Sequence, residues 1–201
     1  MTLKTCRYMA ILILGAIALA APASAAPRVY DLDVAKSHVG FHYTLNGIDQ
    51  TGTMPVSRAK ITIDPNHLAA SRVDVTLAVT RAKTDLFFAT DAIKSAEILD
   101  VKRFPEIRFV STSIKLASNG RLSDGARISG NLTIRGQTRP VTLDASLFRP
   151  PGSAAHDLSN LTVRLAGSIS RAAFGASGYA GLVGDIVKLD ITAVIHIAVA
   201  P

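Results

Sequence analysis

The residues that could bind a metal ion are the five histidines, and their positions argue against a shared site. His38 and His42 fall on one face of an expected strand, but four residues at about 3.3 Å each hold them about 13 Å apart. Imidazole nitrogens bind a metal at about 2.0–2.1 Å, so one ion would reach both only if the strand bent. His67, His156 and His196 lie in an expected turn, in an expected loop and near the C-terminus. We therefore expect no metal site.

No group of residues has the spacing of a catalytic site. Ser37 and His38 are adjacent, but neighbours on a strand point to opposite faces, so they do not form a nucleophile–base pair. The chain has no G-x-S-x-G sequence, the turn that exposes a catalytic serine. Its Gly-rich segment GASGYAGLVGD lacks the Lys-Ser or Lys-Thr of a phosphate-binding loop. We expect no enzyme, although an enzyme with an unfamiliar set of residues stays open.

Two charged residues, Arg171 and Asp185, flank or close this Gly-rich segment. If the chain forms a barrel, as the strand pattern described below predicts, these two residues would lie near its end. There they would either form a structural ion pair or hold the head group of a ligand, and the sequence leaves both open. The segment also carries apolar residues that would form a lip over an opening or belong to a plain connecting loop: Phe174, Tyr179, Leu182 and Val183.

The first 25 residues have the form of a secretory signal peptide. Lys4 and Arg7 give the N-terminus a positive charge. The apolar run from Met9 to Ala21 is too short for a membrane helix, which needs about 20 residues. Ala23-Ser24-Ala25 is a small-x-small cleavage sequence. We expect cleavage after Ala25, which leaves one exported, soluble domain, residues 26–201. An uncleaved N-terminal anchor is the alternative.

Charge and cysteine content narrow the function further. The chain has 22 Lys and Arg against 15 Asp and Glu, a net charge of +7, but the basic residues are scattered and there is no Trp. Nucleic-acid-binding proteins more often cluster basic residues and interleave aromatic ones, so we expect no nucleic-acid partner. The one cysteine, Cys6, lies in the signal segment, which excludes disulfides and cysteine-based zinc sites from the domain. A weak transient contact with anionic membrane surfaces is compatible with the charge.

The elements that would position these residues are mostly strands separated by turns. Apolar residues alternate with polar ones, which is typical of strands with one buried face, and Asn46-Gly47 marks a tight turn. The longest example is the C-terminal segment, where one face carries Val187, Leu189, Ile191, Ala193, Ile195 and Ile197. The strand candidates are Arg28–Asp33, His38–Leu45, Arg58–Ile63, Arg72–Thr80, Ile107–Leu116, Arg127–Arg135, Val141–Phe148, Leu161–Ser170 and Ile186–Val199.

Residues 85–101 break this rhythm and predict one or two short helices, with Ile93 and Leu99 among the apolar positions. Thr90 or Asp91 would cap the start through a side-chain oxygen. Phe104-Pro105 would end the helical segment, because the residue before proline avoids helical geometry. Residues 149–160 are rich in Pro, Gly and Ser and predict a surface loop.

Many strands with turns between them predict an all-β fold. An open sheet would leave two exposed edges, and closure into a barrel removes them. About eight antiparallel strands enclose an interior that holds packed side chains or one small ligand. We therefore expect an antiparallel β-barrel with a short helical insertion, and a β-sandwich is the alternative.

Four groups of motifs, in order, resemble those of the YceI-like family. They are Y-D-L-D with S-H-V-G-F between Tyr30 and Phe41, F-P-x-I-x-F-x-S ending at Ser111, G-N-L-T-x-x-G-x-T-x-P-V from Gly130 to Val141, and R-x-x-F-G with V-G-D-x-V between Arg171 and Val187. The resemblance covers almost all of residues 26–201. It implies an extended lipocalin-like barrel in the periplasm that binds long isoprenoid chains such as quinones or polyprenyl phosphates.

The function that this resemblance implies is binding and carriage of an isoprenoid or similar amphipathic lipid, with no required cofactor beyond a bound polyisoprenoid or quinone. Each buried methylene contributes about 0.8 kcal/mol, so a long tail needs few polar contacts. A soluble interaction partner of a membrane electron-transfer protein is the alternative, and a homodimer stays open. The expected cavity residues are Val39, Phe41, Tyr43, Ile107, Phe109, Leu132, Ile134, Val141, Leu143, Leu165, Ile169 and Phe174, and the head-group candidates are Arg171 and Asp185.

Overall fold

The computed structural model of the protein describes residues 26–116, 125–154 and 157–199. The expected signal peptide, residues 1–25, lies outside these ranges and stays a prediction. Within them, one helix, α1, spans Phe87–Lys94, and three short 3-10 turns are η1 (Leu68–Ala70), η2 (Val79–Arg81) and η4 (Ala172–Phe174). The strands are β1 Arg28–Leu32, β2 His38–Leu45, β3 Ile48–Thr53, β4 Val56–Ile63, β5 Arg72–Ala78, β6 Lys83–Thr84, β7 Glu106–Leu116, β8 Ala126–Ile134, β9 Gln137–Phe148, β10 Asn160–Ser170 and β11 Ile186–Ile197.

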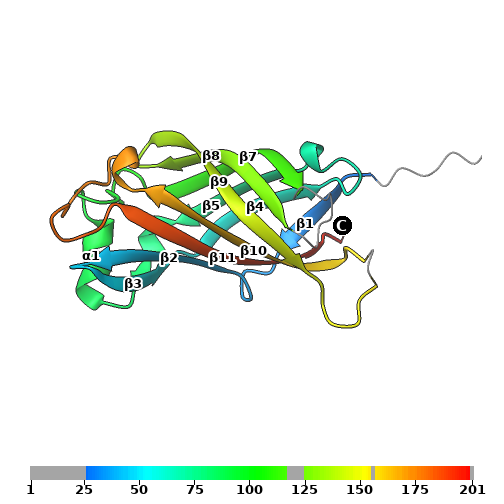
Figure 1. The fold of residues 1–201 in the computed structure, drawn as a ribbon, viewed down its shortest axis with the longest axis horizontal. Coiled ribbons are helices and arrows are strands. Elements are labelled where there is room, and N and C mark those ends of the chain that lie inside the picture. The colour runs from blue at the N-terminus through cyan, green and yellow to red at the C-terminus, as the bar shows by residue number, and fades with distance from the viewer. Residues whose placement is uncertain (1–25, 117–124, 155–156, 200–201) are drawn as a thin grey trace, which may run out of the picture.

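Eight of these strands close into an antiparallel barrel. Their order around the ring is β1-β4-β5-β7-β8-β9-β10-β11, and β11 pairs with β1 to complete it (Figure 1). At the closing pair, Tyr30 lies opposite Ile197 and Leu32 lies opposite Ile195. The predicted antiparallel barrel is therefore confirmed, and the β-sandwich alternative is wrong.

Strands β2, β3 and β6 extend the wall toward the end of the barrel that carries α1 (Figure 1). β11 is twelve residues long, so residues 195–197 pair with β1 while residues 188–192 pair with β2. β3 then pairs with β2, and β6 pairs with β3. β11 thus pairs both with β1, which closes the barrel, and with β2, which begins the extension. This shared pairing makes the barrel elongated.

Two of the strands, β3 and β6, were not among the strand candidates. β3 reads IDQTGT and has one large apolar residue, Ile48, so no alternation marks it. It forms because Asn46 and Gly47 adopt positive φ angles of 50° and 77°, the geometry of the two-residue turn that returns a strand along its neighbour. β6 is two residues long, which is too short to show a pattern.

The helical prediction for residues 85–101 is right in kind and wrong in extent. α1 ends at Lys94, and Ser95 takes the extended conformation that follows it. Residues 96–103 form turns up to Phe104-Pro105. The helix therefore stops well before this Phe-Pro pair, which was the predicted end.

The predicted helix caps are also wrong. Leu86 precedes the first turn without a side-chain cap, and Thr90 and Asp91 lie inside the helix. The Thr90 hydroxyl oxygen instead accepts a hydrogen bond from the backbone N–H of Thr84 at 3.0 Å. This bond ties α1 to β6, so the helix is positioned by the sheet rather than by its own cap.

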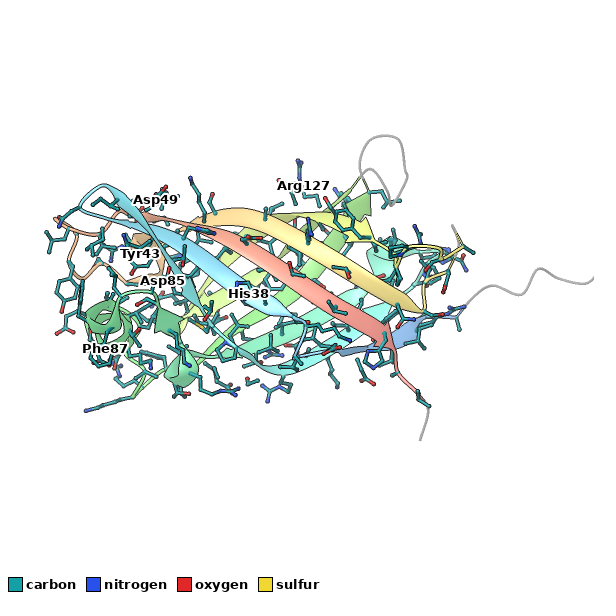
Figure 2. The ribbon with its side chains drawn as sticks, turned by 90° about the horizontal axis from the view of Figure 1, so that it is seen from below. His38, Tyr43, Asp49, Asp85, Phe87 and Arg127 are labelled. Carbon is teal, nitrogen blue, oxygen red and sulfur yellow. The ribbon has the colours of Figure 1, made fainter. Side chains whose placement is uncertain are left out.

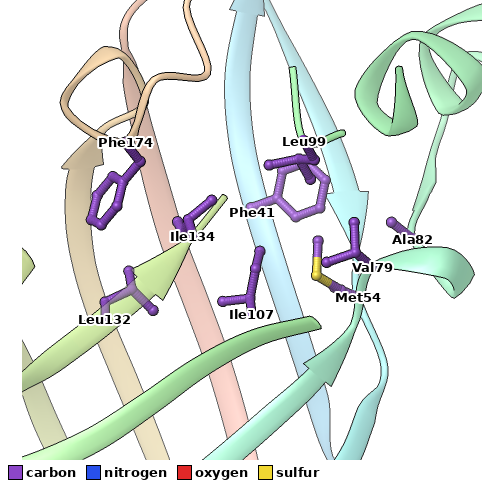
Figure 3. Close-up of a cluster of buried hydrophobic side chains, with 9 residues drawn as sticks. All are labelled: Phe41, Met54, Val79, Ala82, Leu99, Ile107, Leu132, Ile134 and Phe174. Atoms are coloured by element: carbon purple, nitrogen blue, oxygen red, sulfur yellow. The ribbon is translucent and has the colours of Figure 1, made fainter. Parts of the chain in front are cut away.

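The barrel wall separates an apolar interior from a charged exterior. Across the outer face, Arg108 donates to both carboxylate oxygens of Asp74, at 2.9 and 2.6 Å, and this bonding lowers the pKa of Asp74. Arg127 pairs with Asp144 at 3.3 Å on another part of the same surface (Figure 2). Inside, toward α1, buried side chains from separate strands and loops form one cluster (Figure 3): Phe41, Met54, Val79, Ala82, Leu99, Ile107, Leu132, Ile134 and Phe174.

Candidate ligand-binding cavity

A cavity of about 410 Å³ lies inside the α1 end of the barrel and is called the mouth chamber below. Its wall includes residues of β2, α1, the turns after α1 and segment 171–185, which contains the Gly-rich sequence and lies at the same end as α1 (Figure 1). The volume is within the range of about 300–1,000 Å³ that small-molecule sites occupy. Nearly every lining group is apolar, so the mouth chamber suits a hydrocarbon chain.

A second cavity of about 220 Å³, called the inner chamber below, lies further along the barrel, away from α1. It is lined by inward residues of the ring strands and by side chains such as Leu158 and Leu161 toward the opposite end. Val39, Leu77 and Ile107 border both chambers. They come from β2, β5 and β7, so three separate strands form the division between the two cavities.

Most of the residues expected to line a cavity do so. Those in the mouth chamber are Val39, Phe41, Tyr43, Ile107, Ile134, Ile169 and Phe174. Those in the inner chamber are Val39, Ile107, Phe109, Leu132, Leu143 and Leu165. Val141 borders neither chamber and packs against the buried cluster of Figure 3 instead. Whether a ligand contacts these residues stays a prediction.

The two head-group candidates do not form the ion pair that was one of their expected roles. The buried guanidinium of Arg171 donates to four backbone carbonyls: those of Gly184 at 2.9 Å, Gly178 at 2.7 Å, Val183 at 2.8 Å and Ala176. These bonds use four of its five N–H donors. Arg171 borders the mouth chamber, but its hydrogen bonds join residues 176–178 to residues 183–184 within segment 171–185.

Asp185 is exposed and borders neither chamber. Its Oδ1 accepts from the backbone N–H of Ala172 at 2.9 Å. Hydrogen bonding from Ser170, followed by that from Ala172, lowers the pKa of Asp185, and the charge of Arg171 adds to this only as a minor cause. Asp185 therefore fixes the start of η4 and does not face a cavity ligand.

Polar groups at the mouth chamber are few. Tyr43 borders it, and the hydroxyl of Tyr43 is buried without a hydrogen-bond partner. Thr84 also borders it, but the Thr84 hydroxyl donates to the carbonyl of Leu86 at 2.7 Å. Asp85, whose carboxylate accepts a hydrogen bond from Thr51, lies toward the same end as Tyr43 (Figure 2).

Several lining residues were missed at the sequence level. α1 contributes Phe88, Ala89, Ala92 and Ile93 to the mouth chamber. Its helical period was visible, but only the folded chain shows which wall the helix covers. The alternation in β11 could have identified further lining residues, since four residues of its apolar face line the cavities: Val187, Ile191, Ala193 and Ile195.

The opening end of the barrel exposes large apolar side chains. Phe87 and Phe88 of α1 are 86% and 64% exposed, and Ile48, Tyr179 and Leu182 are also exposed. Phe88, Tyr179 and Leu182 border the mouth chamber as well. The apolar lining thus continues onto the outer surface at this end.

Two other features are absent from the part of the chain that the structure describes. In residues 26–116, 125–154 and 157–199, no three His, Cys, Asp or Glu side chains come together as metal ligands. Within the same ranges, no helix is both long and apolar enough to span a membrane.

An elongated antiparallel barrel with apolar chambers and a helix at one end defines, as a class, a barrel protein of the kind that binds hydrophobic ligands. Within this class, the chain belongs to the YceI-like family, because the model of the YceI-like domain matches residues 30–195. This family consists of binding proteins and is not a known family of enzymes.

Individual relatives agree with this assignment. Protein YceI of Salmonella newport is 31% identical over 128 residues, which cover 62% of this chain and 64% of that protein. The match thus spans slightly less than two thirds of that relative. Among solved structures, Burkholderia cenocepacia BcnA has a TM-score of 0.70 and 23% identity over 82% of this chain and 99% of BcnA. The Campylobacter jejuni YCEI protein has a TM-score of 0.58 and 21% identity over 71% of this chain and 81% of that chain. These two likenesses establish the fold.

Proposed function

We propose that the protein is exported to the periplasm and binds and carries an amphipathic lipid with a long isoprenoid-like tail. The observation that carries the proposal is the pair of apolar chambers that meet at Val39, Leu77 and Ile107. The tail would run from the mouth chamber past these residues into the inner chamber. Because each buried methylene contributes about 0.8 kcal/mol, such a path favours a chain over a compact ligand.

The test of this proposal is organic extraction of the protein purified from its own cells, followed by mass spectrometry. We expect an isoprenoid or similar lipid in near-stoichiometric amount, and none after delipidation with solvent. Repeated extraction without lipid, together with no uptake of added prenols, would contradict the proposal. Crosslinking in cells provides the contrast, since a stoichiometric protein partner without bound lipid would favour an interaction role.

Lipid transfer requires contact with a membrane, and we propose the exposed apolar side chains beside α1 as the contacting surface. Phe87 is suited to test this, because it is largely exposed and does not border the mouth chamber. Inserting one phenylalanine into a membrane interface contributes about 1.5–3 kcal/mol. Phe87→Ser should therefore slow lipid transfer from phosphatidylcholine vesicles about tenfold or more and leave the equilibrium affinity for a solubilised lipid unchanged.

The matched control is Phe148→Ser, because Phe148 is also partly exposed but ends β9 at the opposite end of the barrel (Figure 1). We expect this variant to transfer lipid at the normal rate, as measured with a fluorescent prenol moving between vesicles and protein. Equal slowing by both substitutions would show that the α1 end has no special part in membrane contact.

A further inference from the structure

Tyr43 presents an unusual hydroxyl at the mouth chamber. Its ring packs against the buried cluster of Figure 3 and lies 6.2 Å from the ring of Phe41, centroid to centroid. Its hydroxyl is buried and has no hydrogen-bond partner. Leaving a buried polar group without a hydrogen-bond partner destabilises the fold. The described residues provide no partner for this hydroxyl, so a bound ligand would have to provide one.

The nearest polar side chain does not supply the missing bond. The Thr84 hydroxyl lies close enough to lower the pKa of the Tyr43 phenol, but no hydrogen bond joins the two hydroxyls. The Thr84 hydroxyl instead donates to the carbonyl of Leu86 at 2.7 Å and contacts the Thr90 hydroxyl at 3.0 Å. A tyrosine hydroxyl both donates and accepts. Tyr43 therefore has a donor without a partner, and the residue borders a chamber whose other walls are almost wholly apolar.

The charges around Tyr43 decide which acceptor fits. Burial raises the pKa of the Tyr43 phenol, the negative charge of Asp85 raises it further, and Thr84 acts in the opposite direction. Burial and the negative charge of Asp85 disfavour a phenolate, and both would also disfavour an anionic head group at the same place. Arg171 also borders this chamber, but backbone carbonyls take four of its five N–H donors, so one donor remains for a head group.

We propose that the Tyr43 hydroxyl donates a hydrogen bond to a neutral oxygen on the ligand, a carbonyl or hydroxyl head group, and that it selects such lipids over their phosphorylated counterparts. This inference rests on the proposed lipid-binding function. It places the head group at the mouth chamber beside β2 and β6, with the tail directed toward the inner chamber.

The experiment compares three probes with the same C20 isoprenoid tail: geranylgeraniol, geranylgeranyl monophosphate and the hydrocarbon without a head group. Wild-type protein should bind the alcohol more tightly than the phosphate. Tyr43→Phe should weaken binding of the alcohol about five- to tenfold, the loss of one hydrogen bond, and leave binding of the hydrocarbon unchanged. Displacement of a bound fluorescent prenol by each probe gives the three affinities, because the chain has no Trp and the substitution itself removes a tyrosine.

A stability measurement separates this role from a structural one. Tyr43→Phe should leave the Tm of the lipid-free protein unchanged or slightly raised, because it removes an unpartnered group. Tyr30→Phe is the control, since the buried Tyr30 hydroxyl donates to the carbonyl of Leu158 at 2.9 Å. Losing that bond should lower the Tm by about 2–4 °C.

Three results would overturn the inference: a lowered Tm in Tyr43→Phe, equal losses for alcohol and hydrocarbon, or tighter binding of the phosphate by wild-type protein. If none of the three probes binds wild-type protein, the lipid-binding function itself fails. If the hydrocarbon binds and Tyr43→Phe changes nothing, only the role of Tyr43 fails.

Discussion

Val39→Phe should convert the protein from a binder of long chains into a binder of short ones. Val39 borders both chambers, so a larger side chain there would block the path that we propose for the tail. A long prenol such as solanesol would then lose contact with the inner chamber. At about 0.8 kcal/mol per methylene, losing four of them costs about 3 kcal/mol, or more than about a hundredfold in Kd. A short prenol such as geraniol, which fits the mouth chamber alone, should keep its affinity.

The control for this experiment is Val29→Phe, the same substitution at a β1 position that is largely exposed and borders neither chamber. It should bind both prenols as the wild type does. Retained geraniol binding also shows that Val39→Phe is folded. Equal affinity of Val39→Phe and wild type for solanesol would mean that the tail does not pass between the chambers.

Arg171→Met should destabilise the mouth of the barrel more than any surface substitution. Four backbone carbonyls would lose a charged donor, and water would restore only part of that hydrogen bonding. We expect a loss of about 3–5 kcal/mol in the free energy of unfolding. For a domain of this size it corresponds to a fall in Tm of about 10 °C. Hydrogen exchange should rise first in residues 176–184, whose carbonyls the guanidinium holds.

One further variant separates the geometry of Arg171 from its charge, and another serves as a surface control. Arg171→Lys keeps the charge but offers a compact ammonium in place of the planar fork, so it should restore only a minor part of the lost stability. Arg139→Met is the surface control, because the exposed Arg139 makes one bond, to the carbonyl of Ala173 at 3.2 Å, and should change stability by less than about 0.5 kcal/mol. A wild-type Tm in Arg171→Lys would show that charge alone suffices.

The alternation of side chains predicted the inward face of the wall well. Val39, Phe41 and Tyr43 were assigned to one face of one strand, and all three border the mouth chamber. This succeeds because successive side chains of a strand point to opposite sides, so one buried residue fixes its neighbours. Val141 shows the limit, since it faces inward but packs into the buried cluster without reaching a chamber.

The polar residues of the site were harder to interpret. Arg171 and Asp185 stood out by charge and position, yet the guanidinium binds carbonyls and the carboxylate binds a backbone N–H. Tyr43 was counted as one apolar residue among many. Hydrogen-bond partners come from segments far apart in the chain, such as the carbonyl of Leu158 for the Tyr30 hydroxyl, and no local pattern encodes them.

The sequence by itself determined an all-β chain, the inward face of most strands and the position of the one helical insertion. These properties depend on side-chain periodicity and turn chemistry, which act over a few residues. Only the tertiary structure decided that β11 joins both β1 and β2, that α1 covers the mouth chamber, and that the apolar interior is partly empty. Those features depend on how much side-chain volume the closed wall encloses, a property of all the strands together.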